Sequence, residues 1–196
     1  MAKLYFHYAA MNAGKSTTLL QASFNYAESG MHTMLFTAAI DDRSAQGCIE
    51  SRIGLRADAT VFGDATDLFA IVEKANEKKS IDCIFVDEAQ FLSAAQATQL
   101  ARIVDALHIP VMCFGLRTDF RGELFEGSAR LFALADEVKE LKTICHCGRK
   151  ATMNLRIDAH GRAVTDGARV EIGGNDRYRA LCRQHFTEAF EANDGA

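Results

Sequence analysis

Three groups of residues in this 196-residue chain have the types and spacing that chemistry on phosphates or metal ions requires. The first, Gly14-Lys15-Ser16, follows an apolar run and a loop of small residues and precedes a helical pattern. A strand that leads through such a loop into a helix directs several backbone N–H groups, and the positive end of the helix dipole, at one point. Lys15 would reach the outer phosphates of a nucleotide, and the Ser16 hydroxyl would help to hold the Mg²⁺ that bridges them. This segment therefore predicts a phosphate-binding loop.

The loop departs from the P-loop pattern at Ala9, which stands where that pattern has its first glycine. If the position needs an unusual backbone angle, a Cβ there costs roughly 1–3 kcal/mol. An ordinary strand-to-helix turn that happens to contain Gly-Lys-Ser is the alternative interpretation. We expect the loop to bind the nucleotide through Ala9, Ala10, Met11, Asn12, Ala13, Gly14, Lys15 and Ser16.

The second group is a pair of acids, Asp87-Glu88, which ends the apolar run 81–87. An apolar strand that ends in a carboxylate is how P-loop enzymes complete the Mg²⁺ environment, so Asp87 is the residue expected on the metal side. Glu88 is then available as a general base, and Ala89 and Gln90 complete the expected nucleotide-binding set. The alternative is an acidic strand end that faces water. The presence of the phosphate-binding loop favours the catalytic interpretation, because the carboxyl ends of parallel strands meet at one edge of a sheet.

The third group consists of two short pairs of metal-binding residues, Cys145-x-Cys147 and Cys182-x-x-His185, separated by 34 residues. Four such ligands in two pairs are what a tetrahedral structural Zn²⁺ needs. His146 is a competing ligand, but its use would place three consecutive ligands around one ion, so we favour His185. The alternative is a set of unrelated cysteines in a reduced protein.

The elements that must position these residues read as strand, helix, strand, which is typical of a parallel α/β sheet. We expect strands at 3–9, 32–39, 81–87 and 111–116 and a first helix over 15–28. A helix capped by Thr66 and another behind the capping box Ser93-x-x-Gln96 follow. Residues 40–63 read as a long functional loop, and glycines interrupt a β-like stretch after residue 144. We therefore expect a nucleotide-binding domain over 1–144, a zinc-binding domain with a substrate-closing loop over 145–190, and a disordered tail over 191–196.

Composition restricts the class of protein. With 48% hydrophobic and 24% charged residues and no apolar run of membrane-spanning length, the chain is expected to be globular and to have no membrane partner. Its net charge of −4 argues against a nucleic-acid partner, since such domains usually carry a basic face. The N-terminus lacks the layout of a secretory signal, so a cytoplasmic location is expected.

The phosphate-binding loop, the Asp-Glu-x-Gln-Phe strand end and the zinc pairs flanking Ile-Gly-Gly-Asn-Asp-Arg-Tyr occur in an order that resembles the type II thymidine kinases, bacterial members in particular. The resemblance covers residues 4–186. It implies a RecA-like α/β P-loop domain with a small zinc domain, and transfer of the γ-phosphoryl group of Mg-ATP to the 5′-hydroxyl of thymidine or deoxyuridine. Glu88 would be the general base. The further substrate-binding residues that the resemblance implies are Asp41, Arg43, Phe91, Phe120, Phe125, Ile172, Gly173 and Tyr178.

The resemblance also implies a homotetramer and feedback inhibition by dTTP. At position 154 some family members carry a threonine beside the methyl group of the base, whereas this chain has Asn154, so the preference between thymidine and deoxyuridine does not carry over. Two other functions remain as alternatives. One is a RecA-like ATPase that acts on nucleic acid, and the other is a zinc-stabilised binding module with a degenerate phosphate loop.

Overall fold

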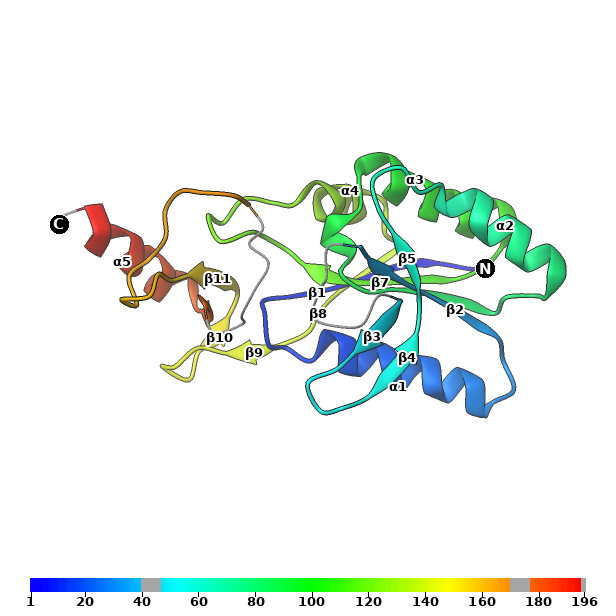
Figure 1. The fold of residues 1–196 in the computed structure, drawn as a ribbon, viewed down its shortest axis with the longest axis horizontal. Coiled ribbons are helices and arrows are strands. Elements are labelled where there is room, and N and C mark those ends of the chain that lie inside the picture. The colour runs from blue at the N-terminus through cyan, green and yellow to red at the C-terminus, as the bar shows by residue number, and fades with distance from the viewer. Residues whose placement is uncertain (40–46, 170–176, 195–196) are drawn as a thin grey trace.

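The computed structural model describes residues 1–39, 47–169 and 177–194. Its centre is a six-stranded sheet with the order β5-β2-β6-β7-β1-β8, in which every neighbouring pair is parallel (Figure 1). The strands are β1 (Leu4–Ala9), β2 (Thr33–Ala38), β5 (Thr60–Phe62), β6 (Cys83–Val86), β7 (Val111–Leu116) and β8 (Glu137–Glu140). The predicted α/β fold with a parallel sheet is therefore confirmed.

Helices cover both faces of this sheet, which explains why its central strands are apolar on both sides. On one face lie α2 (Leu68–Lys78), α3 (Ala94–Arg102) and α4 (Glu126–Leu134), and on the other lie α1 (Lys15–Glu28) and the hairpin of β3 (Cys48–Glu50) and β4 (Arg56–Asp58) (Figure 1). A 3₁₀ turn (Ala89–Phe91) follows β6, and a π-helical turn (Ile103–Leu107) extends α3. The capping box of Ser93 and Gln96 forms as predicted.

The structure corrects two expectations about the first domain. The region 40–63 is not a loop throughout, because β3, β4 and β5 lie within it and β5 is an edge strand of the main sheet. Residues 40–46, which begin this region, lie outside the described residues. The second correction concerns the N-cap of α2, which is Asp67 rather than Thr66, because the Asp67 side chain accepts the N–H of Ala70.

The C-terminal part has a small core of its own, which includes Leu155, Leu181 and Phe186. Its elements are β9 (Thr143–Ile144), β10 (Lys150–Ala151), β11 (Met153–Arg156), β12 (Tyr178–Leu181) and α5 (Arg183–Asp194). Strands β9 and β10 form one antiparallel hairpin and β11 and β12 another. Helix α5 continues to Asp194, so it extends into the segment expected to be a disordered tail. The boundary at residue 144 remains a prediction.

None of the helices in the described ranges combines the length and the apolar character needed to cross a membrane.

Candidate active site

The phosphate-binding loop and the acidic strand end meet at the carboxyl edge of the sheet. Strand β1 delivers the loop and β6 delivers Asp87, with only β7 between the two strands. The Ser16 hydroxyl donates a hydrogen bond of 2.8 Å to Oδ2 of Asp87. The two groups expected to share a Mg²⁺ ion are therefore in direct contact.

The loop turns into α1 through a left-handed glycine, and Ala9 keeps an ordinary strand conformation. Gly14 has φ 75° at the N-terminus of α1, in the left-handed region where a side chain is disfavoured. Ala9 is the last residue of β1, pairs with Leu116 and is not among the residues with positive φ. A Cβ therefore causes no backbone strain at position 9. Lys15 folds back over the loop, where its Nζ donates to the carbonyl of Ala10 at 3.2 Å.

Glu88 occupies a strained and largely buried position. Its φ of 52° and ψ of 37° lie in the left-handed region, which costs a non-glycine residue about 1–3 kcal/mol. Gln90 donates through Nε2 to Oε2 of Glu88 and accepts the N–H of Leu116 at 2.9 Å. Gly115 permits this arrangement, because a Cβ there would lie 2.9 Å from both the N and the Oε1 of Gln90. Gln90, expected in the nucleotide-binding set, thus holds Glu88 against β7.

The two acids interact electrostatically as well. Burial raises the pKa of Asp87 to about 7, and the negative charge of Glu88 adds to the rise. Hydrogen bonds from Ser16 and from the backbone N–H of Glu88, together with the charge of Lys15, act in the opposite direction. The ionised form of Asp87 is therefore poorly solvated by the protein alone, which is an environment suited to a cation.

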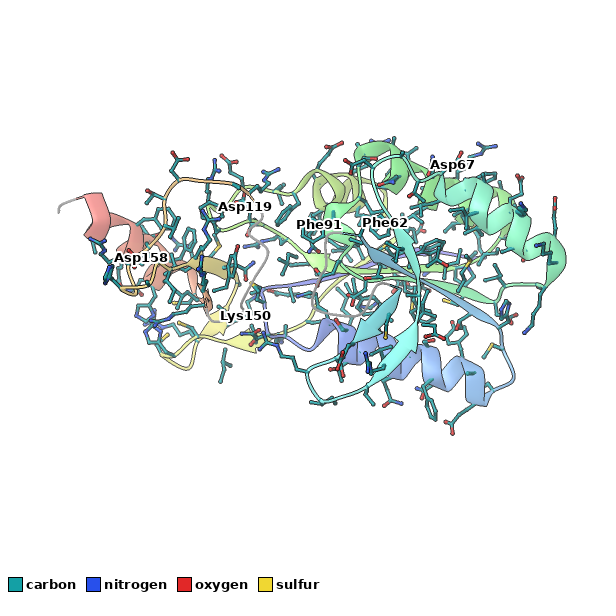
Figure 2. All side chains as sticks on the ribbon, in the orientation of Figure 1. Phe62, Asp67, Phe91, Asp119, Lys150 and Asp158 are labelled. Atoms are coloured by element: carbon teal, nitrogen blue, oxygen red, sulfur yellow. The ribbon has the colours of Figure 1, made fainter. Side chains whose placement is uncertain are left out.

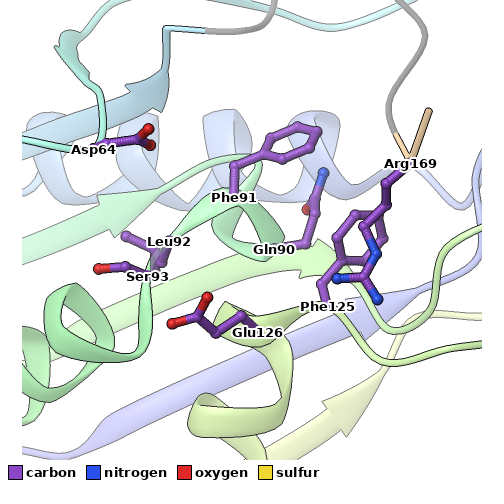
Figure 3. Close-up of a pocket in the computed structure, with 8 residues that line it drawn as sticks. All are labelled: Asp64, Gln90, Phe91, Leu92, Ser93, Phe125, Glu126 and Arg169. Carbon is purple, nitrogen blue, oxygen red and sulfur yellow. The ribbon is translucent and has the colours of Figure 1, made fainter.

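A cavity of about 320 Å³ is lined in part by Gln90, the residue that donates to Glu88, and is large enough for a small ligand (Figure 3). Its lining consists of Asp64, Gln90, Phe91, Leu92, Ser93, Phe125, Glu126 and Arg169. Phe91 and Phe125, both expected at a nucleoside, meet there edge to face with ring centroids 5.9 Å apart. Phe120 is not part of this lining. It is fully buried, and the guanidinium of Arg156 lies 3.8 Å from its ring centroid.

The remaining residues expected at the substrate are only partly within the described ranges. Tyr178 is half-buried at the start of β12, where it pairs with Arg156. Asp41, Arg43, Ile172 and Gly173 lie outside the described residues. The roles given to these five residues remain predictions.

Asn154 connects the C-terminal part to the phosphate-binding loop, a role that the sequence did not reveal. Its Oδ1 accepts the N–H of Met11 at 2.7 Å, and its Nδ2 donates to the carbonyl of Thr118 at 3.2 Å. The side chain is buried. Spacing along the chain carries no signal for this contact, because Asn154 and Met11 are 143 positions apart.

The four predicted metal ligands come together. The ligand atoms of Cys145, Cys147, Cys182 and His185 all lie within 4.8 Å of one another. Nδ1 of His185 is 3.3 Å from Sγ of Cys145 and 3.6 Å from Sγ of Cys182, and the Sγ atoms of Cys147 and Cys182 are 3.9 Å apart. A tetrahedral zinc with bonds of about 2.0–2.3 Å has ligand-to-ligand distances of roughly 3.4–3.8 Å, so the cluster fits this ion.

The pKa of Cys145 also supports a metal at this cluster. Although burial opposes ionisation of Cys145, hydrogen bonds from the backbone at Cys147 and Cys182 and from His185 lower the pKa of its thiol to about 6. A thiolate is the form that binds zinc. His146 is not one of the four; its ring stacks on that of His185 with a centroid distance of 4.3 Å.

The parallel sheet, the Gly-Lys-Ser loop against Asp87 and the separate Cys₃His cluster are typical of a P-loop nucleotide-binding protein with an additional candidate metal site. Comparison with known proteins identifies which one. A family model described as thymidine kinase matches residues 2–186, and the chain therefore belongs to the thymidine kinase family.

Proteins named thymidine kinase from three bacteria illustrate the similarity. The protein of Novosphingobium aromaticivorans is 64% identical over 189 residues, which are 96% of this chain and 98% of that protein. The protein of Vibrio vulnificus is 60% identical over the same shares. That of Agrobacterium fabrum is 56% identical over 193 residues, 98% of this chain and 100% of its own length.

Proposed function

We propose that this thymidine kinase uses Glu88 as the general base that accepts the proton of the thymidine 5′-hydroxyl while the γ-phosphoryl group of ATP is transferred to that oxygen. The observation that supports the proposal is the contact of Ser16 with Asp87, which brings the phosphate-binding loop to the strand end that carries Glu88. Thymidine monophosphate and ADP would be the products. The same contact argues against a degenerate phosphate loop.

Phosphoryl transfer has a loose transition state, so catalysis depends mostly on positioning and on neutralising charge. Lys15 and the N–H groups at the start of α1 would bind the phosphates. Glu88, held by Gln90, need only accept the proton as transfer proceeds. The left-handed backbone at Glu88 turns the chain immediately after β6.

Ser16 and Asp87 would hold the Mg²⁺ that accompanies ATP. The buried Asp87 carboxylate with a raised pKa is consistent with a group whose charge is balanced by a bound cation. When bound, the ion would neutralise charge that develops on the phosphate oxygens.

The nucleoside would occupy the cavity that Phe91 and Phe125 line. Flat apolar rings that meet edge to face suit the faces of a pyrimidine base. We further propose that Phe120, Tyr178, Asp41, Arg43, Ile172 and Gly173 contribute to the substrate site, as the resemblance implies. Phe120 would then act from behind the cavity wall, because it is buried under Arg156.

The test is an assay of purified protein with thymidine, ATP and MgCl₂, scored for thymidine monophosphate by chromatography. Glu88→Gln should lower kcat by about 10²–10⁴ while binding of labelled ATP is retained. Full turnover by Glu88→Gln would exclude Glu88 as the base. ATP hydrolysis that single-stranded DNA stimulates, with no nucleoside phosphorylated, would favour the ATPase alternative. The same assay with deoxyuridine measures the preference between the two nucleosides.

We propose that the Cys₃His cluster holds one structural Zn²⁺, because its four donors have the spacing and the chemistry that zinc requires. The ion would stabilise a unit whose own core is small. Metal analysis of the purified protein should find about one zinc per chain, and a folded, metal-free protein would exclude the site.

We propose that the protein forms a homotetramer, that dTTP inhibits it and that it is located in the cytoplasm. Inhibition by dTTP would follow from its chemistry, because it joins thymidine to a triphosphate that fits the phosphate loop. A cytoplasmic location agrees with six free cysteines. Light scattering measures the mass of the assembly, and inhibition competitive with both substrates would support dTTP as a ligand of this site.

A further inference from the structure

Arg169 belongs to the C-terminal part of the chain, yet it lines the cavity of the first domain together with Phe125 (Figure 3). We infer that Arg169, anchored by the buried Asp119, is a positioning residue that sets the Phe125 wall of the nucleoside cavity. This inference rests on the proposed function, because it takes the cavity to be the nucleoside site.

The anchor is an ion pair between Arg169, whose side chain is 41% exposed, and the buried carboxylate of Asp119. Nε of Arg169 donates to Oδ2 of Asp119 at 2.8 Å, and the side chain of Asp119 is only 1% exposed. The other carboxylate oxygen, Oδ1, accepts the backbone N–H groups of Arg121 and Glu123 at 2.9 and 3.0 Å. The loop itself therefore fixes Asp119 and directs Oδ2 toward Arg169. Figure 2 shows Asp119 where the first domain meets the C-terminal part.

The guanidinium of Arg169 also makes one contact with the backbone before Phe125 and one with the Phe125 ring. Nη2 of Arg169 donates to the carbonyl of Leu124 at 3.1 Å, directly before Phe125, and Cζ lies 5.3 Å from the centroid of the Phe125 ring. A cation at this distance from an aromatic face is attracted to it. Arg169 thus restrains both the backbone before Phe125 and the ring itself. A second ion pair, with Glu123 at 3.5 Å, contributes little because the Glu123 side chain is 66% exposed.

Hydrogen bonds also fix the backbone directly before Arg169. Nη1 and Nη2 of Arg156 donate to the carbonyls of Ala168 and Asp166 at 2.7 and 2.9 Å, and Arg121 donates to the carbonyl of Gly167. Three successive carbonyls therefore accept hydrogen bonds from two arginines. Gly167 is needed here, because its φ is +120° and a Cβ would lie 2.7 Å from Nη2 of Arg156.

These contacts distinguish positioning from phosphate binding. The charge of Arg169 is paired with a buried carboxylate, and removal of Arg169 would leave that carboxylate without its cation. This pairing holds Arg169 at Asp119, so we assign it to the cavity wall and not to the phosphates. Its loss should weaken binding of the nucleoside and leave the ATP steps unchanged.

The test compares Arg169→Ala, Arg169→Lys and the control Arg162→Ala, which removes an exposed arginine paired with Asp158 in the same part of the chain. We expect Arg169→Ala to raise KM for thymidine about tenfold, the effect of losing hydrogen bonds to a charged group, with KM for ATP and kcat within about twofold. Arg169→Lys should recover part of the loss, because lysine keeps the charge at Asp119 but lacks the fork that also reaches Leu124. The control should match the wild type.

An unchanged KM for thymidine in Arg169→Ala, or a fall in kcat accompanied by a rise in KM for ATP, would overturn the inference. If Arg169→Ala does not fold, Arg169→Gln, which keeps donors but no charge, is measured by the same criteria. The wild type is assayed first. A wild type that does not phosphorylate thymidine refutes the proposed function, whereas an active wild type with an unaffected Arg169→Ala refutes only this inference.

Discussion

Replacing Asp87 by asparagine should make the ligand-free protein more stable at neutral pH while it lowers kinase activity. Burial raises the pKa of Asp87 to about 7, so its ionised form destabilises the folded chain. The folded state favours the protonated acid, and stability is therefore greatest below the unfolded pKa and is lost as pH rises through the folded pKa. Asparagine has no ionised form and avoids this loss.

The size of the effect follows from two pKa values of this carboxyl group, 3.8 as its ordinary value and about 7 in the folded chain. At 1.36 kcal/mol per pKa unit, the raised pKa of Asp87 lowers the free energy of unfolding by roughly 4 kcal/mol at about pH 8 and by roughly 2 kcal/mol at about pH 5. Asp87 accepts hydrogen bonds from Ser16 and from the N–H of Glu88, and asparagine would lose one of them at about 1 kcal/mol. The expected net gain in the free energy of unfolding is about 1 kcal/mol at the lower pH and about 3 kcal/mol at the higher.

The assay is urea denaturation of the wild type and of Asp87→Asn without nucleotide or Mg²⁺ at both pH values. Comparison at one pH cancels the titration of the metal ligands. The matched control is Asp119→Asn, which alters another buried aspartate, one that is paired with Arg169 and two backbone N–H groups. Asp119→Asn should destabilise the protein at both pH values. If Asp87→Asn were less stable than the wild type at both pH values, or if its gain in the free energy of unfolding did not grow with pH, Asp87 would not be the source of the pH-dependent loss of stability.

Three further perturbations test the surroundings of the site. Gln90→Ala removes a hydrogen-bond donor to Glu88 and should lower kcat about tenfold with KM for ATP unchanged, as measured by steady-state kinetics; an unaffected kcat would mean that Gln90 does not orient the base. Asn154→Ala leaves the N–H of Met11 without its buried acceptor and should cost about 1–3 kcal/mol in urea denaturation while raising KM for ATP; equal stability would contradict the bridge. Cys182→Ser removes one of four metal ligands and should reduce bound zinc well below one per chain by elemental analysis, and full retention of zinc would show that Cys182 is not a ligand.

The predictions that succeeded depend on strong local patterns. The turn from β1 into the first helix and the strands at β6 and β7 were predicted because apolar runs and a glycine at the helix start mark them in the sequence. Region 48–62 differs from the expected loop because β3, β4 and β5 have three residues each, which is too few to show an alternation of apolar and polar residues. Strand β5 exists because β2 offers it a partner, and no local pattern encodes that pairing. The N-cap of α2 is Asp67 and not the expected Thr66. Both residue types are suitable caps, so the sequence does not decide between the two neighbouring positions.

What the sequence alone determined is the set of reactive residues: a lysine and a serine at a helix start, two acids at a strand end and four candidate metal ligands in two pairs. Residue types and short spacings carry this information, because each group is built within a few positions of the chain. Tertiary structure alone decided how the groups are supported. Asn154 at the phosphate loop, Gln90 between Glu88 and β7, and Arg169 on Asp119 join distant or separately folded segments. Only a folded chain brings such partners within hydrogen-bonding distance, so no spacing along the sequence could have indicated them.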